Sequence, residues 1–529
     1  MGDEAAMGNA EGGAWVGGRV FTGVRYAEAL LVEDGIAVAT GSRRSVLRNK
    51  GTGTPVRDVG GHLLIPGLID AHLHLSATMN ASRQVDLKDV TSRRELRARI
   101  ERWRSSHSSE PVVGRGWNEE VLQDHRLPTR RDLDAISTDR PIVLERICGH
   151  AAVVNSYVLD AMELDRSSPD PVGGRIGRDS DGSPTGLLYD AALEQVPARW
   201  WRAVTGNETA LAQTLRSAAS YGHTSIGAMD AGPVEVVAVC RRARVGPLKV
   251  GVHFFLSARA RESFTSLRDR AVVGEAEFAG VKAYADGSFG ARTAWLRASY
   301  ADAPGEVGLA ASSEDELRTS IDWAEVRGLI PALHAIGDRA MLEVLRLFRE
   351  RPRGRLRRIE HASLTPPAVL KVLDQVRPCL VVQPAFVVDD WWLKERLGMP
   401  RTRWAYRFRS FLTRGYRLAG SSDSPASSID PWSGMQAAMD RRDRQGRSAN
   451  PSPRESLSAE EALSLYTSNA GAALGHPELG SLEPGSPGDL VVLGVHTLED
   501  AVRLGRDSVL ECWRRGRRVH RARSGHRAP

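Results

Sequence analysis

The sequence is poor in cysteine and contains no long apolar run. Its four cysteines, at positions 148, 240, 379 and 512, form no paired motif. That spacing excludes a disulfide framework and a Cys-rich zinc module, and it favours reduced thiols in a cytoplasmic protein. No run approaches the roughly 18 apolar residues that a membrane span needs, and the acidic start at Asp3 and Glu4 does not resemble a secretory signal. We therefore expect a cytoplasmic protein with no membrane partner.

Lysine is also scarce, because only six of the 72 basic residues are lysines. The net charge is +7, and residues 514–529 contain seven arginines and no acidic residue. The basicity therefore belongs mostly to this tail and not to a binding face. A solvated, disordered tail over 521–529 is expected, and no nucleic-acid partner.

Residue types that bind metals follow several strand-like apolar runs. The run over 63–74 ends in His72 and His74, whose side chains point the same way because side chains alternate along a strand. Similar runs carry Lys282, His334, His361 and Asp423. Neutral imidazole and carboxylate are ligands of zinc, iron and manganese. Any one of these residues could instead be a hydrogen-bonded structural group, but their recurrence predicts a divalent metal site with one or two ions. We expect Zn²⁺, with Mn²⁺ or Fe²⁺ as alternatives.

Lys282 lies in the apolar run FAGVKAYADG of a chain that otherwise prefers arginine. A buried lysine can lose its proton and act as an amine nucleophile, whereas arginine cannot. Attack on CO₂ would give a carbamate whose oxygens can bridge two metal ions. The alternative is an ion pair, for example with Asp286.

The order of apolar runs predicts a parallel α/β barrel. Eight strands are expected at 67–74, 223–230, 249–255, 279–286, 329–334, 357–361, 379–383 and 417–423. Helices are expected at 233–245, 258–275, 313–328, 338–351, 366–376 and 404–415. Eight alternating units favour a closed (β/α)8 TIM-like barrel, whose functional residues gather at the carboxyl ends of the strands.

Three sections besides the tail flank or interrupt the barrel of residues 67–445. Residues 446–520 contain a C-terminal helix and then short strands, which are also expected in residues 1–66. Neither end has enough apolar residues for a core of its own. The stretch from about 77 to 222 is too long for one connection and predicts an inserted subdomain over the barrel mouth. It could instead serve only packing or contacts in a homodimer.

Eight motifs occur in an order that resembles amidohydrolase family 3 of the amidohydrolase superfamily, which includes N-substituted formamide deformylases. They are PGLIDAHLHL, GRGWNEEV, GHAAVVNSYVL, VKAYADGSFGARTAWL, HAIGDRAM, RIEHASL, GSSDSPASSIDP and GSLEPGSPGDLVVL. The similarity covers about residues 15–520. It implies a metallohydrolase barrel beside a small composite β-sandwich built from both chain ends.

The resemblance also implies roles for the metal-binding residues. His72 and His74 would hold one ion with Lys282 and Asp423, and the second ion would bind His334, His361 and Lys282. Asp423 would accept a proton from a metal-bound hydroxide and pass it to the departing nitrogen. In a one-ion version Lys282 stays uncarboxylated and some histidines contact the substrate.

Four further residues are candidates for contact with a small-molecule substrate. His150 would be a catalytic donor to the substrate carbonyl, although family members usually carry Asp-Gly-His where this chain has Cys148-Gly149-His150. A purely structural His150 is the alternative. Trp117, Asp286 and Arg292 are further candidates for lining the pocket, Arg292 as a carboxylate ligand.

These observations favour a metal-dependent hydrolase of a C–N amide bond, of N-formyl or N-acyl amine type. The alternatives are an aminohydrolase that releases ammonia from a heterocyclic or amidine-type substrate, and a non-catalytic relic of the fold. A relic would be expected to lack one or more ligand positions, and all six are filled.

Overall fold

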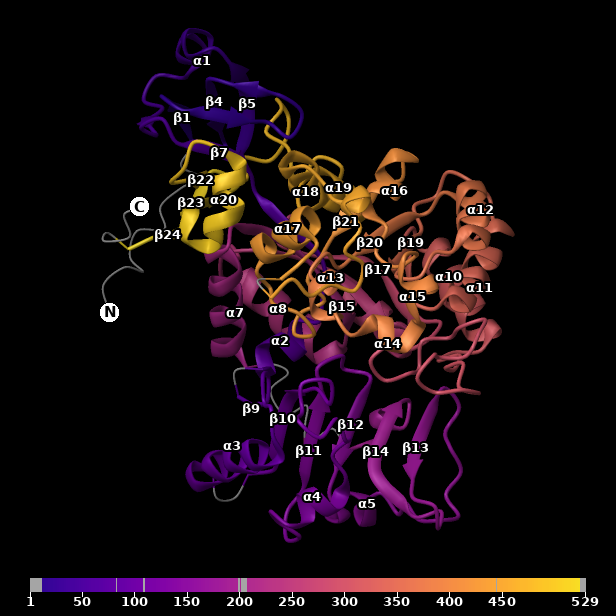
Figure 1. Cartoon of the computed structure of the whole chain (residues 1–529). Coiled ribbons are helices and arrows are strands. Elements are labelled where there is room, and N and C mark those ends of the chain that lie inside the picture. Colours follow the sequence, from indigo (N-terminus) through magenta and orange to yellow (C-terminus); the bar gives the residue numbers. More distant parts are fainter. Residues whose placement is uncertain are drawn as a thin grey trace.

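The computed structural model describes residues 12–81, 83–107, 110–197, 200, 207–443 and 445–523. Figure 1 shows a central barrel, a small β-sandwich on one side built from strands near both ends of the described chain, and a separate sheet on the other side. Within these residues, no helix combines the length and the apolar character that crossing a membrane would require. Of the predicted disordered tail, residues 524–529 lie outside the described part, and Arg521 is the last residue of a strand.

Eight parallel strands form the barrel. They are β8 (Leu68–Leu73), β15 (His223–Ala231), β16 (Gly251–Ser257), β17 (Ala276–Tyr284), β18 (Ile330–Ala335), β19 (Arg358–His361), β20 (Cys379–Val382) and β21 (Leu418–Gly420), each paired with its neighbour in this order. Just beyond β8 and β21 the ring closes, because the Asp423 N–H donates to His72 O at 2.8 Å and the His74 N–H donates to Ser424 O at 2.9 Å. The predicted (β/α)8 barrel is confirmed.

Helices pack around the barrel and start where the sequence provides caps. They include α8 (Pro233–Val245), α10 (Glu314–Val326), α11 (Asp338–Arg349) and α12 (Pro367–Val376). Ser313 and Glu316 form a capping box at α10, and Pro233 occupies the first turn of α8, where its missing N–H is not needed.

Two predicted helices are wrong in length. The stretch 258–275 contains only the short pieces η2 (Ala258–Ser263), α9 (Phe264–Leu267) and η3 (Arg268–Arg270), because residues 271–275 form a tight turn into β17 in which the Val272 N–H donates to Ala276 O at 2.8 Å. The stretch 404–415 keeps only α16 (Phe408–Thr413), because Tyr406 has a left-handed φ of 51°.

Both chain ends form the sandwich. One sheet has the order β5-β4-β1-β6, and the other has the order β24-β23-β22-β7-β2-β3. The strands are β1 (Gly13–Val16), β2 (Arg19–Phe21), β3 (Tyr26–Ala27), β4 (Ala29–Glu33), β5 (Ile36–Gly41), β6 (Val56–Asp58), β7 (Leu63–Pro66), β22 (Leu490–Leu493), β23 (Val509–Arg514) and β24 (Arg517–Arg521). β7 pairs antiparallel with β22, and Trp15 meets Trp513 edge-on at 5.2 Å between the sheets. The composite sandwich of the predicted fold is therefore present.

Between α2 (Leu75–Ala81) and α7 (Glu208–Ser220) in the sequence, the chain forms a six-stranded sheet, which Figure 1 shows on the side of the barrel away from the sandwich. Its strands are β9 (Val85–Asp86), β10 (Val112–Trp117), β11 (Ile142–Arg146), β12 (Ala151–Val154), β13 (Gly174–Arg178) and β14 (Pro184–Asp190). The segment after β11 reaches the mouth of the barrel, where Arg146 and His150 line the same cavity as Asp423. On this basis we propose that the domain boundaries are those predicted from the sequence.

Candidate metal centre

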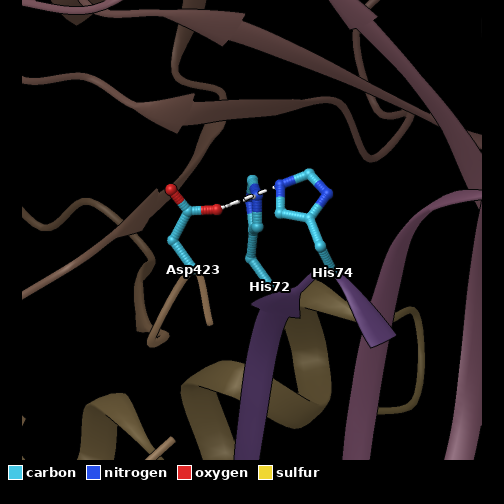
Figure 2. Close-up of side chains that lie close together, drawn as sticks. All are labelled: His72, His74 and Asp423. Carbon is cyan, nitrogen blue, oxygen red and sulfur yellow. Dashed lines mark ion pairs between the residues drawn. The ribbon is translucent and has the colours of Figure 1, made fainter. Parts of the chain in front are cut away.

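Three metal-binding side chains meet at the carboxyl end of the barrel: His72 of β8, His74 directly after that strand, and Asp423 after β21. The Nε2 atoms of His72 and His74 each lie 3.1 Å from Oδ1 of Asp423, and the three side chains point toward one another in Figure 2. Asp423 has a left-handed φ of 55°, and its N–H is held by His72 O. The backbone itself therefore aims the carboxylate at the two rings.

The other ring nitrogen of each histidine is already engaged. Nδ1 of His72 lies 2.7 Å from Oε2 of the buried Glu360, and Nδ1 of His74 lies 3.4 Å from Oδ2 of Asp230. Glu360 accepts the Nδ1–H of His72, so the lone pair of that ring is left on Nε2. The nearby carboxylate of Asp230 favours the same tautomer in His74. Both lone pairs then face Asp423.

His361 and His334 continue the row of imidazoles. Their ring centroids lie 4.3 Å apart, and His361 lies 5.2 Å from His72. His361 Nδ1 is 2.7 Å from Gln383 Oε1, and His334 Nε2 is 3.0 Å from Gly287 O. Each ring can therefore donate one N–H and offer its other nitrogen. Burial holds the pKa of both rings well below the ordinary value, so both are neutral.

Lys282 lies inside this group. Its Nζ is 3.4 Å from Nε2 of His72 and 4.6 Å from the centre of the Tyr284 ring, and only 1% of the residue is exposed. Burial lowers the pKa of the ammonium, although the charges of nearby carboxylates oppose that effect. Among the described residues no ion pair to Lys282 is found, and Asp286 instead accepts backbone N–H groups from Trp295, Ile336 and Gly337 at 2.7–3.0 Å. The alternative of a Lys282–Asp286 ion pair is therefore wrong.

The donor set fits a divalent metal ion. Asp423 Oδ1 is buried without a hydrogen-bond partner and faces two imidazole nitrogens whose lone pairs point the same way. Three lone pairs that converge within 4.8 Å of one another repel unless a proton or a cation lies between them.

His150 lies at the cavity beside the metal ligands, with its ring 5.1 Å from that of His334. Its Nδ1 lies 2.6 Å from Oδ1 of Asp190 on β14. Burial alone would lower the pKa of His150, but the charge and hydrogen bond of Asp190 outweigh it and raise the pKa to about 9. The ring is therefore a cationic N–H donor at neutral pH.

The structure corrects three predicted substrate contacts. Trp117 is fully buried in the core of the inserted sheet, where its indole N–H donates to Leu144 O at 2.7 Å. Asp286 is occupied by the backbone N–H groups described above. Arg292 pairs with Asp302 at 2.7 Å. None of these three side chains lines the cavity described at the barrel mouth.

Sequence reasoning missed Arg146 and the segment that follows β20. Arg146 forms two hydrogen bonds with Glu119, at 2.8 and 3.2 Å, while its buried Nη1 has no partner and the residue lines the cavity. The lining of the cavity also includes Phe386, Asp390 and Trp392. The arginine four residues before His150, in the motif ERICGH, is the sequence feature that indicates a cavity residue here. No sequence pattern indicates that the residues after β20 line the cavity.

The free energy of unfolding should depend on pH because of Glu235, a buried residue in the first turn of α8. Its carboxylate accepts hydrogen bonds from the N–H and hydroxyl of Ser76, and burial raises its pKa to about 7 although those hydrogen bonds lower it. The folded state therefore binds this proton more tightly than the unfolded state. The free energy of unfolding should fall as pH rises from about 5 to about 7 and then stay low.

Glu235→Gln should remove this fall and raise the free energy of unfolding at about pH 8 by about 3 kcal/mol. Urea unfolding of both proteins at about pH 5 and about pH 8 measures the difference. An equally steep pH dependence in the variant would contradict a proton on Glu235.

Comparison with known proteins decides the family. The model of the amidohydrolase family matches residues 56–520. The chain belongs to the amidohydrolase family. It is 33% identical over 500 residues to the amidohydrolase YtcJ of Bacillus subtilis (strain 168), a match that covers 90% of this chain and 93% of the relative. As a member of this family it is a hydrolase of carbon–nitrogen bonds, as predicted.

Two further relatives bear on the function. This amidohydrolase is 27% identical over 495 residues to the N-substituted formamide deformylase of Arthrobacter pascens, covering 88% of this chain and 90% of that enzyme. A crystal structure of an uncharacterized metal-dependent hydrolase from Pyrococcus furiosus superposes with a TM-score of 0.71 at 31% identity, covering 91% of this chain and 98% of the other.

Proposed function

We propose that this amidohydrolase cleaves N-formyl or N-acyl amines with a zinc-containing centre. The observation that carries the proposal is the convergence of His72 Nε2, His74 Nε2 and Asp423 Oδ1 beside a cavity at the barrel mouth. The similarity to a formamide deformylase supports the substrate type. The four cysteines are free, which agrees with the cytoplasmic location that forms part of this proposal.

The residues of the chain divide the work of amide hydrolysis. When bound, the metal would supply Lewis acidity toward the carbonyl oxygen and lower the pKa of water. Asp423 accepts the proton of the attacking water and returns it to the amine nitrogen as the C–N bond breaks. His150, held cationic by Asp190, donates an N–H toward the carbonyl oxygen, where negative charge develops.

We propose two ions bridged by a carbamate on Lys282. The lysine Nζ lies 3.4 Å from Nε2 of His72 and close enough to His334 and His361 to act on both electrostatically, and burial favours its uncharged, nucleophilic form. A carbamate at this position would offer one oxygen to each of the two metal ions. It would also replace a buried amine with an anion that offsets part of the charge of two cations.

The cavity walls indicate a small substrate with an apolar or aromatic part. Phe386 stacks parallel to His361 at 6.3 Å, and Trp392 packs beneath the Arg146 guanidinium at 5.8 Å. The free Nη1 of Arg146 is a donor for an acyl or carboxylate oxygen in the same cavity.

A substrate screen tests the proposal. Protein loaded with Zn²⁺ or Mn²⁺ is incubated with N-formyl and N-acyl amines and, separately, with amidines and aminated heterocycles. The first class should release an amine together with a carboxylate, measured by chromatography. Release of ammonia from the second class alone would replace the proposal with an aminohydrolase.

A further inference from the structure

A second group of metal-binding side chains lies at the opposite end of the barrel. His253 of β16, Glu277 of β17 and His476 after α19 (Ser468–Ala473) each offer one ligand atom, and these atoms lie within 4.8 Å of one another. His253 and Glu277 stand near the amino ends of their strands, whereas the catalytic residues lie at the carboxyl ends. The two groups are therefore separate sites.

The barrel itself brings two of these side chains together. His253 and Glu277 are direct partners in the parallel pairing of β16 with β17, so their side chains project from the same face. Further along the two strands, Phe255 and Ala279 belong to the same buried hydrophobic cluster as Ala470 and Ala473 of α19. This cluster holds α19 against the end of the barrel at which the pair lies.

The end of α19 brings His476 to the pair. Gly475 has a left-handed φ of 88°, and the His476 N–H donates to Gly471 O at 3.0 Å, which is how glycine commonly ends a helix. The rings of His476 and His253 lie 4.8 Å apart. Nε2 of His476 lies 3.3 Å from Oε2 of Glu277.

Each side chain is oriented so that one ligand atom stays available. Nδ1 of His476 lies 2.9 Å from Oε1 of Glu478, which leaves Nε2 as the ligand atom, in the arrangement of carboxylate, histidine and metal that zinc sites use. Glu277 accepts the Gly274 N–H through Oε1, which leaves Oε2. His253 is only 6% exposed, and its Nδ1 is buried without a hydrogen-bond partner. A buried ring nitrogen without a partner is unfavourable unless a ligand fills the site.

Charges around the group permit a dication. Glu277 and Glu478 contribute two carboxylates. Two arginines act on His253 electrostatically. Arg514 is bound by Glu275 at 2.8 Å, and Arg515 stands against Gly274 and donates its backbone N–H to Asp489. Both arginines carry positive charge toward His253, but each has a carboxylate beside it.

We propose that His253, Glu277 and His476 bind a structural Zn²⁺ ion that fastens the loop after α19 to the floor of the barrel. Two imidazoles and one carboxylate are a common zinc donor set, and the half-exposed His476 leaves a fourth position for water. The ion would join β16 and β17 to the segment that leads from the barrel into the C-terminal strands of the sandwich.

Zinc content and thermal stability test this site. Wild type, Glu277→Gln and His476→Ala are stripped with a chelator, dialysed against buffered Zn²⁺ and analysed for bound zinc. Each variant should bind about one zinc ion per chain fewer than wild type, because the catalytic ligands are unchanged. Zn²⁺ should raise the Tm of wild type by several degrees more than that of either variant.

The second carboxylate gives a graded test. Glu478→Gln removes the anionic acceptor of His476 Nδ1 without removing a ligand, and should weaken this zinc ion about 10- to 100-fold. His496→Ala, which removes an exposed histidine of the sandwich that contacts Gly61 O, is the matched control and should keep full zinc content. Equal zinc content in wild type, Glu277→Gln and His476→Ala would overturn the proposal. The zinc content and the Tm are measured without any enzymatic activity. Their outcome is therefore independent of the substrate screen and of the proposed function.

Discussion

Asp423→Asn is expected to lower kcat/KM by about 10³-fold while the protein remains folded. The substitution keeps the size of the side chain, but an amide cannot accept a proton from water at neutral pH, and its oxygen is a weak metal ligand. The carboxylate is also the one acceptor that faces both His72 and His74. Steady-state kinetics with the best amide from the screen and zinc analysis of the same preparation measure both effects.

Asp269→Asn is the matched control for this change. Asp269 lies in η3, before the amino end of β17, and its side chain is 83% exposed. Among the described salt bridges it pairs only with Arg268. It should keep wild-type kinetics and zinc content. His72→Ala should lose zinc as Asp423→Asn does. Unchanged zinc stoichiometry and activity in both His72→Ala and Asp423→Asn would show that these residues do not form the metal centre.

Lys282→Ala is expected to lose one of two metal ions and at least about 10²-fold in activity, because the bridge between the ions would be gone. Short carboxylic acids should restore part of the activity by placing carboxylate oxygens where the carbamate was. Lys371→Ala, at an exposed lysine of α12, should behave as wild type. Metal analysis, kinetics with and without acetate, and the intact mass of wild type measure these results.

Lys282→Arg separates a carbamate from a simple positive charge. A guanidinium keeps the charge but cannot add CO₂, so this variant should be as inactive as Lys282→Ala and should not respond to acetate. Full activity with two bound ions in Lys282→Arg would rule out the bridge.

The sequence predicts the barrel well because its strands are local patterns. An apolar run that ends at a ligand residue is visible for β8, β17 and β18 without any knowledge of their neighbours, and each strand appears within a few residues of its predicted limits. The helices over 258–275 and 404–415 are shorter than predicted because a turn before β17 and the left-handed backbone of Tyr406 interrupt them. Those interruptions come from tertiary packing, which a local pattern does not contain.

The candidate site likewise has one part that the sequence predicts and another that it does not. Histidines at strand ends converge because the barrel brings the carboxyl ends of its strands together, and that geometry follows from the fold class. Trp117 instead belongs to the inserted sheet, where the direction of its side chain depends on Gly116 with a φ of 106° and on the packing of Leu144. The wall that contains Asp390 and Trp392 lies in a loop, and nothing in the order of the strands predicts where that loop lies.

The pairing of β7 with β22 can form only late in protein synthesis. β7 is separated by Gly67 alone from β8, the strand that carries His72 and leads into His74. The Gly67 N–H donates to Asp489 O at 2.8 Å. A nascent chain emerges with β7 early, but its partner strand is made more than 400 residues later, in β22 over Leu490–Leu493. The sheet edge beside the metal-binding strand therefore stays unpaired until translation is nearly complete. A chain that stops before β22 would expose that edge to pairing with other chains, which makes truncated products prone to aggregate.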